Sequence, residues 1–516
     1  MSNKWCFGFS LLIAYILTEM WDDLGKYRLV EIIVFVLVFI GCLIISPGIN
    51  MLIPLALGLL FCILLFIKGS SGVIQLGMFA LVAVNIIFLA NWEYAPFGTD
   101  YSHTATTYKE VSSIMETSES YSFSNHYQDD DFYRISGSDL TQNASILFGT
   151  HTTDFYWSLN NANEANFRRD MAIDEYSLFN YREFDKRSTL YKLANVKYYL
   201  TPKGYDGLIP SGYEYEKNID DYDVYVANDP LPFGYTTDKK LSYDDWSKLN
   251  PVAKEEALSG YVVLENADSD GFDTSVVELP YEISGSDIEI VDEGVLAKKD
   301  NAIMKLSYKC EDAMANYLYF SGFDFDDTRN YYAGKDTSAK LEIAGIDRNE
   351  IFTYSNNDSR YYNARHDFVM YLGNNERNEI EIQITFESKG LYSFDKMQIL
   401  ALEQSKLDEN LKEMGNEHLE NVVFGIDEAS GTINSSKDQY LILSIPYSKG
   451  WKAYVDDKEV EVYQADVYHL ALAIEKGNHE VRLVYQNKLI DYGLYLSLVG
   501  VVLVTADIII TKRRRG

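Results

Sequence analysis

The segment NADSDG, which begins at residue 266, has residue types and spacing that could bind a divalent cation. Asn266, Asp268 and Asp270 match the first half of a calcium-binding loop, in which oxygen ligands alternate along the chain and a glycine makes the sharp turn. The bidentate acid that completes such a loop should fall on position 277, which is Val277, and Glu278 comes one place late. The incomplete pattern favours a solvated turn between domains over a linker stiffened by calcium.

Aromatic side chains are the second chemical feature, with 41 tyrosines and 6 tryptophans in the chain. Exposed aromatic rings can stack on sugar rings, and nearby carboxylates can accept protons from sugar hydroxyls. The candidate glycan contacts are Tyr354, Tyr361, Tyr362 and Trp451, and a further aromatic cluster comprises Phe155, Tyr156 and Trp157. Tyrosine also fills the faces of sheets and places its hydroxyl at their rims. Packing is therefore the favoured alternative for Trp451, while both interpretations stay open for the loop from Tyr354 to Tyr362.

Two short acidic runs resemble the paired aspartates with which nucleotide-sugar transferases position a metal on a diphosphate. They are Asp129 to Asp131, and Asp324 with Asp326 and Asp327. Neither run lies beside a nucleotide-binding pattern of alternating strands and helices, and the chain contains no phosphate-binding glycine loop. We interpret both runs as solvated turns. The seven histidines are scattered, so no zinc site is predicted.

Charge and composition exclude several classes of protein. The formal net charge is −32, and nearly all of it falls on residues 94–490, because the two flanking segments almost balance. Such a surface repels nucleic acid and attracts cations. The mean hydropathy of −0.17 fits a few membrane spans that carry a large polar region. Only Cys310 lies in that region, so no internal disulfide can form there and its stability must come from a hydrophobic core.

Apolar segments at both ends predict membrane helices at residues 5–20, 29–46, 51–67, 73–92 and 489–511. The first is short enough to be an interfacial helix instead of a span. The last ends in a basic cytoplasmic tail at 512–516, which the positive-inside rule keeps in the cytoplasm. Residues 94–490 should therefore lie outside the cell membrane.

The polar region predicts an α+β membrane protein with three extracytoplasmic parts. Residues 94–265 mix short strands and helices, and Asn250 before Pro251 predicts the start of one helix. Residues 275–402 form a β-sandwich of jelly-roll type, because segments such as 379–386 alternate polar and apolar residues. Residues 415–488 form a smaller β-sandwich.

Several segments resemble one known family in the expected order. They are FYRI at 132–135, LANVKYYLTP at 193–202, YDVYVANDPLPFGY at 222–235, PYSKGWKAYVDDKEVEV at 446–462 and EKGNHEVRLVY at 475–485. Together they make the chain similar to the C-terminal half of bacterial YfhO-family membrane proteins, from about residue 131 onward. In the hairpin turn VDDKEV, Asp457 stands where family members usually have glycine, which leaves the turn type open.

The resemblance implies an envelope protein related to glycosyltransferases of the GT-C type. Such a protein transfers a sugar from a polyprenyl phosphate onto a polymer of the lipoteichoic acid type. The related enzymes place their catalytic acid in an early extracytoplasmic loop, and the resemblance to the family's C-terminal half implies that this loop and the catalytic helices are missing from the chain. Asp22 and Asp23 are paired carboxylates, but the predicted topology puts them on the cytoplasmic side beside Lys26 and Arg28, where they terminate a helix.

We therefore name no catalytic residue. Two interpretations stay open: the activity needs a separate catalytic membrane subunit, or the chain is a truncated, inactive form. The resemblance establishes no cofactor, and a divalent cation is the single candidate. The alternative is a non-catalytic, membrane-anchored scaffold whose sandwiches bind glycans.

Overall fold

The computed structural model describes residues 131–515, except 139, 141–142, 144, 147–148, 158–159, 175–179, 312, 327–337, 345–348, 356–361 and 375–378, together with residues 80, 83 and 84. The predicted spans at 5–20, 29–46 and 51–67, Asp22, Asp23 and Tyr361 lie outside the described residues, as does nearly all of the span at 73–92. The chain divides into two compact units, Met1–Ile114 and Met115–Gly516, and the account below concerns the second.

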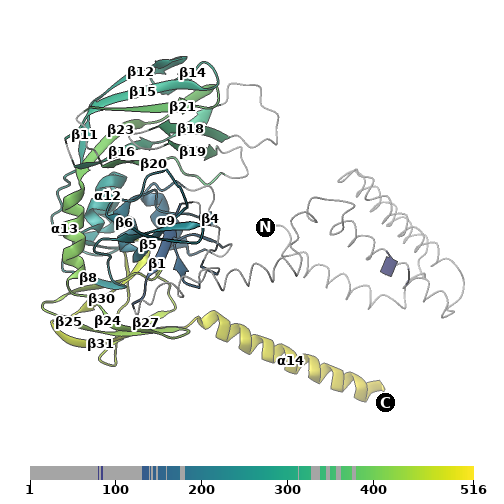
Figure 1. The fold of residues 1–516 in the computed structure, drawn as a ribbon. Helices are drawn as coiled ribbons and strands as arrows, with labels where there is room; N and C mark the ends of the chain where they lie inside the picture. Colours follow the sequence, from purple (N-terminus) through teal and green to yellow (C-terminus); the bar gives the residue numbers. More distant parts are fainter. Residues whose placement is uncertain are drawn as a thin grey trace, which may run out of the picture. The chain divides into compact units, whose positions relative to one another are not determined.

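The first sheet carries the elements that surround the candidate site (Figure 1). Its strand order is β2-β1-β5-β7-β6, in which β1 pairs in parallel with β2 and β5 while β7 pairs antiparallel with β5 and β6. The strands are β1 Arg134–Gly137, β2 His151–Thr152, β5 Val196–Pro202, β6 Tyr213–Ile219 and β7 Tyr222–Ala227. Beside it lie the pair β3 Phe155–Tyr156 and β4 Asn180–Tyr181 and the helices α9 Ala162–Asp170 and α10 Ser188–Leu193. The mixed sheet and its helices agree with the α+β character predicted here.

A six-stranded sheet joins two segments that the sequence analysis assigns to separate domains. Its order is β8-β26-β30-β29-β10-β9. The strands are β8 Gly234–Thr237, β9 Lys240–Ser242, β10 Val262–Leu264, β26 Gln439–Leu443, β29 Tyr463–Ala465 and β30 His469–Ile474. Pairing of β8 with β26 and of β10 with β29 brings together residues about 200 positions apart. The two predicted domains, residues 94–265 and 415–488, therefore share one sheet instead of forming separate ones.

Two helices follow β9 in this part, α11 Tyr243–Ser247 and α12 Pro251–Leu258. The side chain of Asn250 accepts hydrogen bonds from the amides of Val252 and Ala253, at 3.0 and 2.9 Å. Pro251 occupies the first turn, where its missing N–H costs nothing. The predicted helix start at Asn250 is confirmed.

The described residues of 277–403 form thirteen strands in three sheets, with orders β11-β23-β16-β20, β12-β15-β21-β18-β19 and β13-β14-β22-β17. The strands are β11 Val277–Leu279, β12 Tyr281–Ser286, β13 Ile288–Val291, β14 Gly294–Ala297, β15 Ala302–Lys309, β16 Met314–Ser321, β17 Asp324–Asp326, β18 Ser338–Ala344, β19 Asn349–Ser355, β20 Phe368–Asn374, β21 Glu379–Phe386, β22 Gly390–Ser393 and β23 Lys396–Glu403. In β21, Ile380, Ile382, Ile384 and Phe386 are buried, so the predicted alternation is confirmed. All three sheets contribute to one hydrophobic core, and the jelly-roll topology stays a prediction.

The opposite face of the β16–β20–β23 layer packs on the α+β part. Tyr317, Tyr371 and Leu402 belong to a cluster with Val252 of α12 and Leu407. Leu407 lies on α13 Gln404–Gly415, which connects the strand-rich region to the last sheet. Apolar residues therefore line both faces of this layer.

The last sheet has the order β24-β25-β31-β27-β28 and leads into the C-terminal helix. Its elements are β24 Glu420–Phe424, β25 Glu428–Ser435, β27 Trp451–Val455, β28 Lys458–Val460 and β31 Gly477–Tyr485, followed by α14 Lys488–Arg515. Asp456 and Asp457 join β27 to β28 with φ of 50° and 62°, which is the geometry of a type I′ turn and resolves the turn type that the sequence leaves open. Within α14, the 23 residues Lys488–Ile510 are long and apolar enough to cross a membrane.

Candidate functional site

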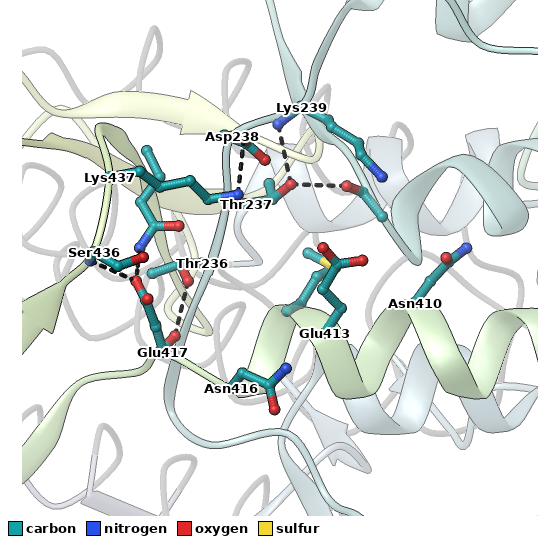
Figure 2. Close-up of a pocket in the computed structure, with 13 residues that line it drawn as sticks. Thr236, Thr237, Asp238, Lys239, Asn410, Glu413, Asn416, Glu417, Ser436 and Lys437 are labelled. Atoms are coloured by element: carbon teal, nitrogen blue, oxygen red, sulfur yellow. Dashed lines mark hydrogen bonds and ion pairs between the residues drawn. The ribbon is translucent and has the colours of Figure 1, made fainter. Parts of the chain in front are cut away.

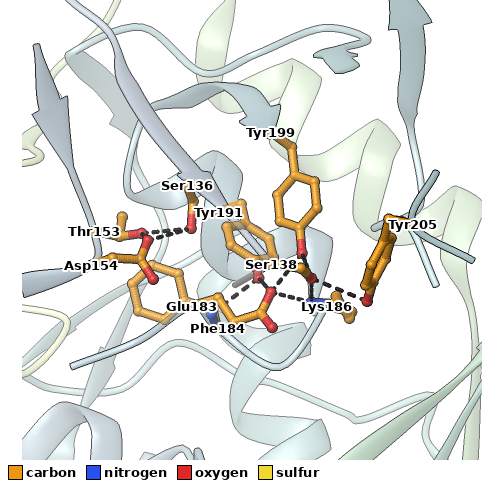
Figure 3. A network of polar contacts seen from close by, with 10 residues as sticks. All are labelled: Ser136, Ser138, Thr153, Asp154, Glu183, Phe184, Lys186, Tyr191, Tyr199 and Tyr205. Atoms are coloured by element: carbon orange, nitrogen blue, oxygen red, sulfur yellow. Dashed lines mark hydrogen bonds and ion pairs between the residues drawn. The ribbon is translucent and has the colours of Figure 1, made fainter. Parts of the chain in front are cut away.

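A network of buried and half-buried polar side chains centres on the half-buried Glu183, in the turn between β4 and α10 (Figure 3). Its carboxylate accepts hydrogen bonds from the hydroxyls of Tyr199 and Tyr191, at 2.6 and 3.0 Å, and pairs with the ammonium of Lys186. Lys186 is 1% exposed and also donates to Ser138, which follows β1. The network thus joins β1, β5, α10 and the turn before α10.

The backbone of this turn is strained and is held by remote contacts. Asp185 and Lys186 have φ of 50° and 60°, a conformation that costs a residue with a side chain roughly 1–2 kcal/mol. The carboxylate of Asp185 accepts a hydrogen bond from the amide of Asp174 at 2.8 Å, which fixes the turn from outside.

The next residue, Arg187, anchors the turn to α12. Its Nε lies 2.7 Å from Oε2 of Glu255, and the two side chains are 0% and 1% exposed. The guanidinium also donates to the carbonyls of Met171 and Pro251, at 2.6 and 3.3 Å. A buried charge with a partner and further hydrogen bonds is tolerated, whereas losing the partner is costly.

Two carboxyls beside the network have pKa values raised into the neutral range. Burial, together with the charge of Glu183, raises the pKa of Asp154 to about 7, against hydrogen bonds from Ser136 and Thr153 that lower it. Burial, with the charge of Asp174, raises the pKa of Asp185 to about 8. Perturbed carboxyls of this kind gather at functional sites more often than elsewhere.

A cavity of about 110 Å³ adjoins the network and shares Thr153 and Phe184 with it. Its other lining residues are Arg134, Thr152, Phe155, Glu164, Ala194, Ser444, Pro446, Tyr468 and His469. These residues come from the first sheet, β3, α9, the turns that flank α10, and β30 with the loops beside it in the six-stranded sheet, so the cavity exists only once both larger sheets have assembled.

The lining of the cavity offers both donors and acceptors. Arg134 donates to the carbonyls of Ala194 and Ser444, at 2.9 and 2.6 Å, which fixes its guanidinium at the wall. Burial raises the pKa of Glu164, and Arg168, 3.4 Å away, opposes that rise. Burial lowers the pKa of His469, so its imidazole is neutral near pH 7. Its Nδ1 lies 3.5 Å from the hydroxyl of Tyr235 and 3.7 Å from the carboxylate of Asp466.

Exposed aromatic side chains stand next to this cavity. Phe155 lines it, and Tyr156 and Trp157, the next two residues, are 42% and 59% exposed. Trp157 directly follows β3 in the chain and is not among the residues that line the cavity. Because clefts for drug-sized ligands hold roughly 300–1,000 Å³, this cavity is too small to enclose a whole ligand of that size.

Two of the hollows that lie away from the network are lined in part by α13. One of about 190 Å³ is bounded by β8, the end of α13 and the turn before β26 (Figure 2). In it Lys437 pairs with Asp238 at 2.8 Å, and Glu417 accepts from the amide of Ser436 at 3.1 Å, so its charged groups largely satisfy one another. The other, of about 610 Å³, is lined by Phe132, Lys197, Phe233, His418 and Val422 among others.

The structure separates the predicted glycan contacts. Tyr354 is 2% exposed, its hydroxyl donates to Asp324 at 3.0 Å, and its ring packs on Phe323, which favours the packing alternative. Tyr362 is half-buried with its hydroxyl 3.0 Å from His366. Trp451 is half-buried at the start of β27 and does not lie in the cavity described above.

The predicted calcium loop is held by protein groups. Asp270 accepts a hydrogen bond from the amide of Lys240 at 2.8 Å, and the amide of Asp270 donates to the carbonyl of Lys240. These bonds fasten the segment containing Asn266 and Asp268 to β9. In the part of the chain that the structure describes, no group of three or more His, Cys, Asp or Glu side chains could hold a metal. The calcium site at Asn266, Asp268 and Asp270 stays a prediction, and this geometry favours the turn.

The sequence analysis missed the centre of the network. The run REFDKR at 182–187 has the composition of a solvated turn, and its partners Ser138 and Glu255 lie 48 and 68 residues away from it. No local periodicity marks it as buried. Only the cluster Phe155, Tyr156 and Trp157 could have been found from the sequence.

A strand-rich region that runs into an apolar terminal helix is the architecture of a membrane-anchored protein. This chain belongs to the YfhO family, because the family model described as "Bacterial membrane protein YfhO" matches residues 2–497. The resemblance noted from the sequence is thereby confirmed.

One relative is a Bacillus subtilis (strain 168) protein described as "Uncharacterized protein YfhO", which is 23% identical over 372 residues. That alignment covers 70% of this chain and 41% of the relative, so the chain spans less than half of the relative's length.

Similarity to solved structures is slight. Dimeric latent PorU from Porphyromonas gingivalis is 9% identical with a TM-score of 0.17, covering 54% of this chain and 27% of PorU. Vicilin from Corylus avellana (hazelnut) is 8% identical with a TM-score of 0.11, covering 41% of this chain and 81% of vicilin. Scores this low do not establish a shared fold.

Proposed function

We propose that this YfhO-family protein binds a sugar unit of a cell-envelope polymer outside the membrane and presents it for glycosylation. The observation that carries the proposal is the polar cavity walled by Arg134, Glu164 and His469 beside the exposed rings of Tyr156 and Trp157. Stacking on an aromatic face combined with hydrogen bonds to hydroxyls is the chemistry that recognises a pyranose. In this proposal the apolar part of α14, Lys488–Ile510, crosses the membrane, with the basic end of the helix in the cytoplasm and residues 131–487 outside.

Each group has a defined task in this proposal. Trp157 supplies the stacking face, and Glu164 and His469 exchange hydrogen bonds with sugar hydroxyls that reach into the cavity. Glu183, Lys186 and Arg187 do not line the cavity and act as positioning residues, because they hold the turn that carries Phe184 to its wall.

The donor in this proposal is a sugar on polyprenyl phosphate, and the acceptor is a polymer of the teichoic acid type. The catalytic acid comes from a separate membrane subunit, since no residue of the described region is assigned that role. The rival is a scaffold that binds the polymer without any transfer.

Binding of teichoic-acid fragments to the full chain in nanodiscs, followed by saturation-transfer NMR, tests the proposal. Trp157→Ala should weaken binding about tenfold, because an aromatic contact of roughly 1–1.5 kcal/mol is lost. Tyr215→Ala is the matched control, since Tyr215 is 58% exposed on β6 and lies outside the cavity. Equal binding by the Trp157→Ala and wild-type proteins would refute the site.

Transfer is tested separately. The chain is reconstituted with labelled polyprenyl-phosphate sugar and acceptor, alone and with a candidate catalytic subunit. Label should reach the acceptor only with the subunit present. Binding without transfer in both reactions would favour the scaffold.

A further inference from the structure

The tip of the β24–β25 hairpin exposes apolar side chains where a polar turn is the norm. Ile426 is 99% exposed, Val423 is 65% exposed and Phe424 is 43% exposed. Neighbouring exposed apolar residues of this size mark a surface that contacts another apolar phase. We therefore expect the hairpin tip, residues 423–427, to contact an apolar partner.

The hairpin tip lies close to the start of α14, which indicates that its apolar partner is the membrane. The amide of Tyr485, the last residue of β31, donates to the carbonyl of Asp427 at 2.8 Å. α14 begins at Lys488, three residues later, and three extended residues span roughly 10 Å. The tip thus lies within about one strand-width or two of the point where the chain turns into its membrane helix.

Side chains around this point match the composition of a membrane interface. Trp451 packs on Tyr485 with ring centroids 5.1 Å apart, and Tyr492 and Tyr495 are 58% and 64% exposed on the first turns of α14. Tryptophan and tyrosine concentrate at the boundary between headgroups and acyl chains. If these aromatic side chains lie at the membrane interface, Ile426 lies beside the outer leaflet.

The hairpin tip is also rigid, which suits an anchor. The ring of Phe424 packs on Phe233 and Phe132 with centroids 4.9 and 4.7 Å apart. The amide of Gly425 donates to the carbonyl of Glu428 at 2.7 Å and closes the turn. Ile426 is therefore presented outward by a fixed backbone, so little ordering cost attends insertion.

We propose that the hairpin tip inserts into the outer leaflet of the membrane that α14 crosses and forms a second anchor beside it. Two anchors fix the tilt of the last sheet against the membrane, which a single helix joined through Gln486 and Asn487 cannot do. Because β24 also lines the 610 Å³ cleft through Val422, insertion holds that cleft close to the lipid surface. The inference rests on the proposed membrane crossing of α14 and is independent of sugar binding.

Fluorescence of single-cysteine variants in nanodiscs tests this anchor. The four native cysteines are replaced by alanine, and an environment-sensitive fluorophore is attached to Ile426→Cys, Lys476→Cys or Val502→Cys. Lys476 is exposed and directly precedes β31 at its far end, and Val502 is 66% exposed in the middle of α14. Because Ile426 is almost fully exposed, its replacement removes no core contact.

At position 426 the emission should shift to the blue and be quenched at least twofold by nitroxide-labelled lipids. Position 476 should show neither effect, and position 502 should show both. Quenching at 502 without quenching at 426 overturns the anchor while α14 still crosses the membrane. A blue shift at 426 without lipid quenching overturns it in favour of a protein contact. Loss of quenching at both 426 and 502 refutes the membrane crossing itself.

Discussion

Replacing Asp154 with asparagine should make the region around β1 and β5 less sensitive to pH between 5 and 7. Asp154 is 6% exposed, and burial together with Glu183 raises its pKa from 3.8 to about 7. In the unfolded chain the same carboxyl ionises near its ordinary pKa. Between these two values the folded state binds one more proton than the unfolded state, so stability falls as pH rises.

The size of the effect follows from the shift. Each pH unit in this window costs 1.36 kcal/mol per carboxyl, and the slope flattens near the folded-state pKa. From pH 5 to pH 7, wild type should therefore lose on the order of 2 kcal/mol relative to Asp154→Asn. Asp185, whose pKa is raised to about 8, contributes the same pH dependence to the unfolding free energy of both proteins, so its contribution cancels in the comparison.

Hydrogen exchange with mass spectrometry on the full chain measures this difference. Protection of peptides covering β1 and β5 is compared between wild type and Asp154→Asn at the same pH, so that the intrinsic exchange rates cancel. Between pH 5 and pH 7, the ratio of the wild-type protection factor to that of Asp154→Asn should fall by roughly thirtyfold, which corresponds to about 2 kcal/mol. If the ratio of the two protection factors stays constant from pH 5 to pH 7, or rises, Asp154 is ionised in the folded protein at pH 5 and the reasoning is refuted.

Three further changes test other parts of the fold. Glu255→Leu should destabilise the protein by about 3–5 kcal/mol because it leaves Arg187 buried and unpaired, and adding Arg187→Met should recover part of the loss; a double variant less stable than Glu255→Leu would contradict this. Asp238→Asn should lower stability by less than about 1 kcal/mol at pH 7. The hydrogen bond from Lys437 lowers the pKa of Asp238, so the stabilising contribution of the pair is present at neutral pH and disappears as pH falls through that pKa. Equal denaturation midpoints for the two proteins at pH 7 would contradict a stabilising pair. Ile442→Ala should cost about 2–5 kcal/mol and speed amide exchange in β8 as well as β26, since the two strands pair; an effect confined to β26 would argue against the shared sheet.

The sequence alone determined the local elements and the family. Period-two alternation marked β21, the Asn250 cap marked the start of α12, and an apolar run before a basic tail marked α14. These signals are local, because side-chain period, capping chemistry and length are read from neighbouring residues. Five family-like segments spread from residue 132 to 485 were enough to indicate the YfhO family.

Tertiary structure alone decided which strands pair and which charges are buried. Alternation shows that one face of a strand is apolar but does not name its neighbour, so the pairing of β8 with β26 could not be foreseen. The charged run containing Glu183, Asp185 and Lys186 looks solvated until Tyr191, Tyr199 and Ser138 close over it. Burial of an ionisable group depends on partners far away in the chain, and that is why the candidate site emerged from the fold while its aromatic rim at Tyr156 and Trp157 was already visible in the sequence.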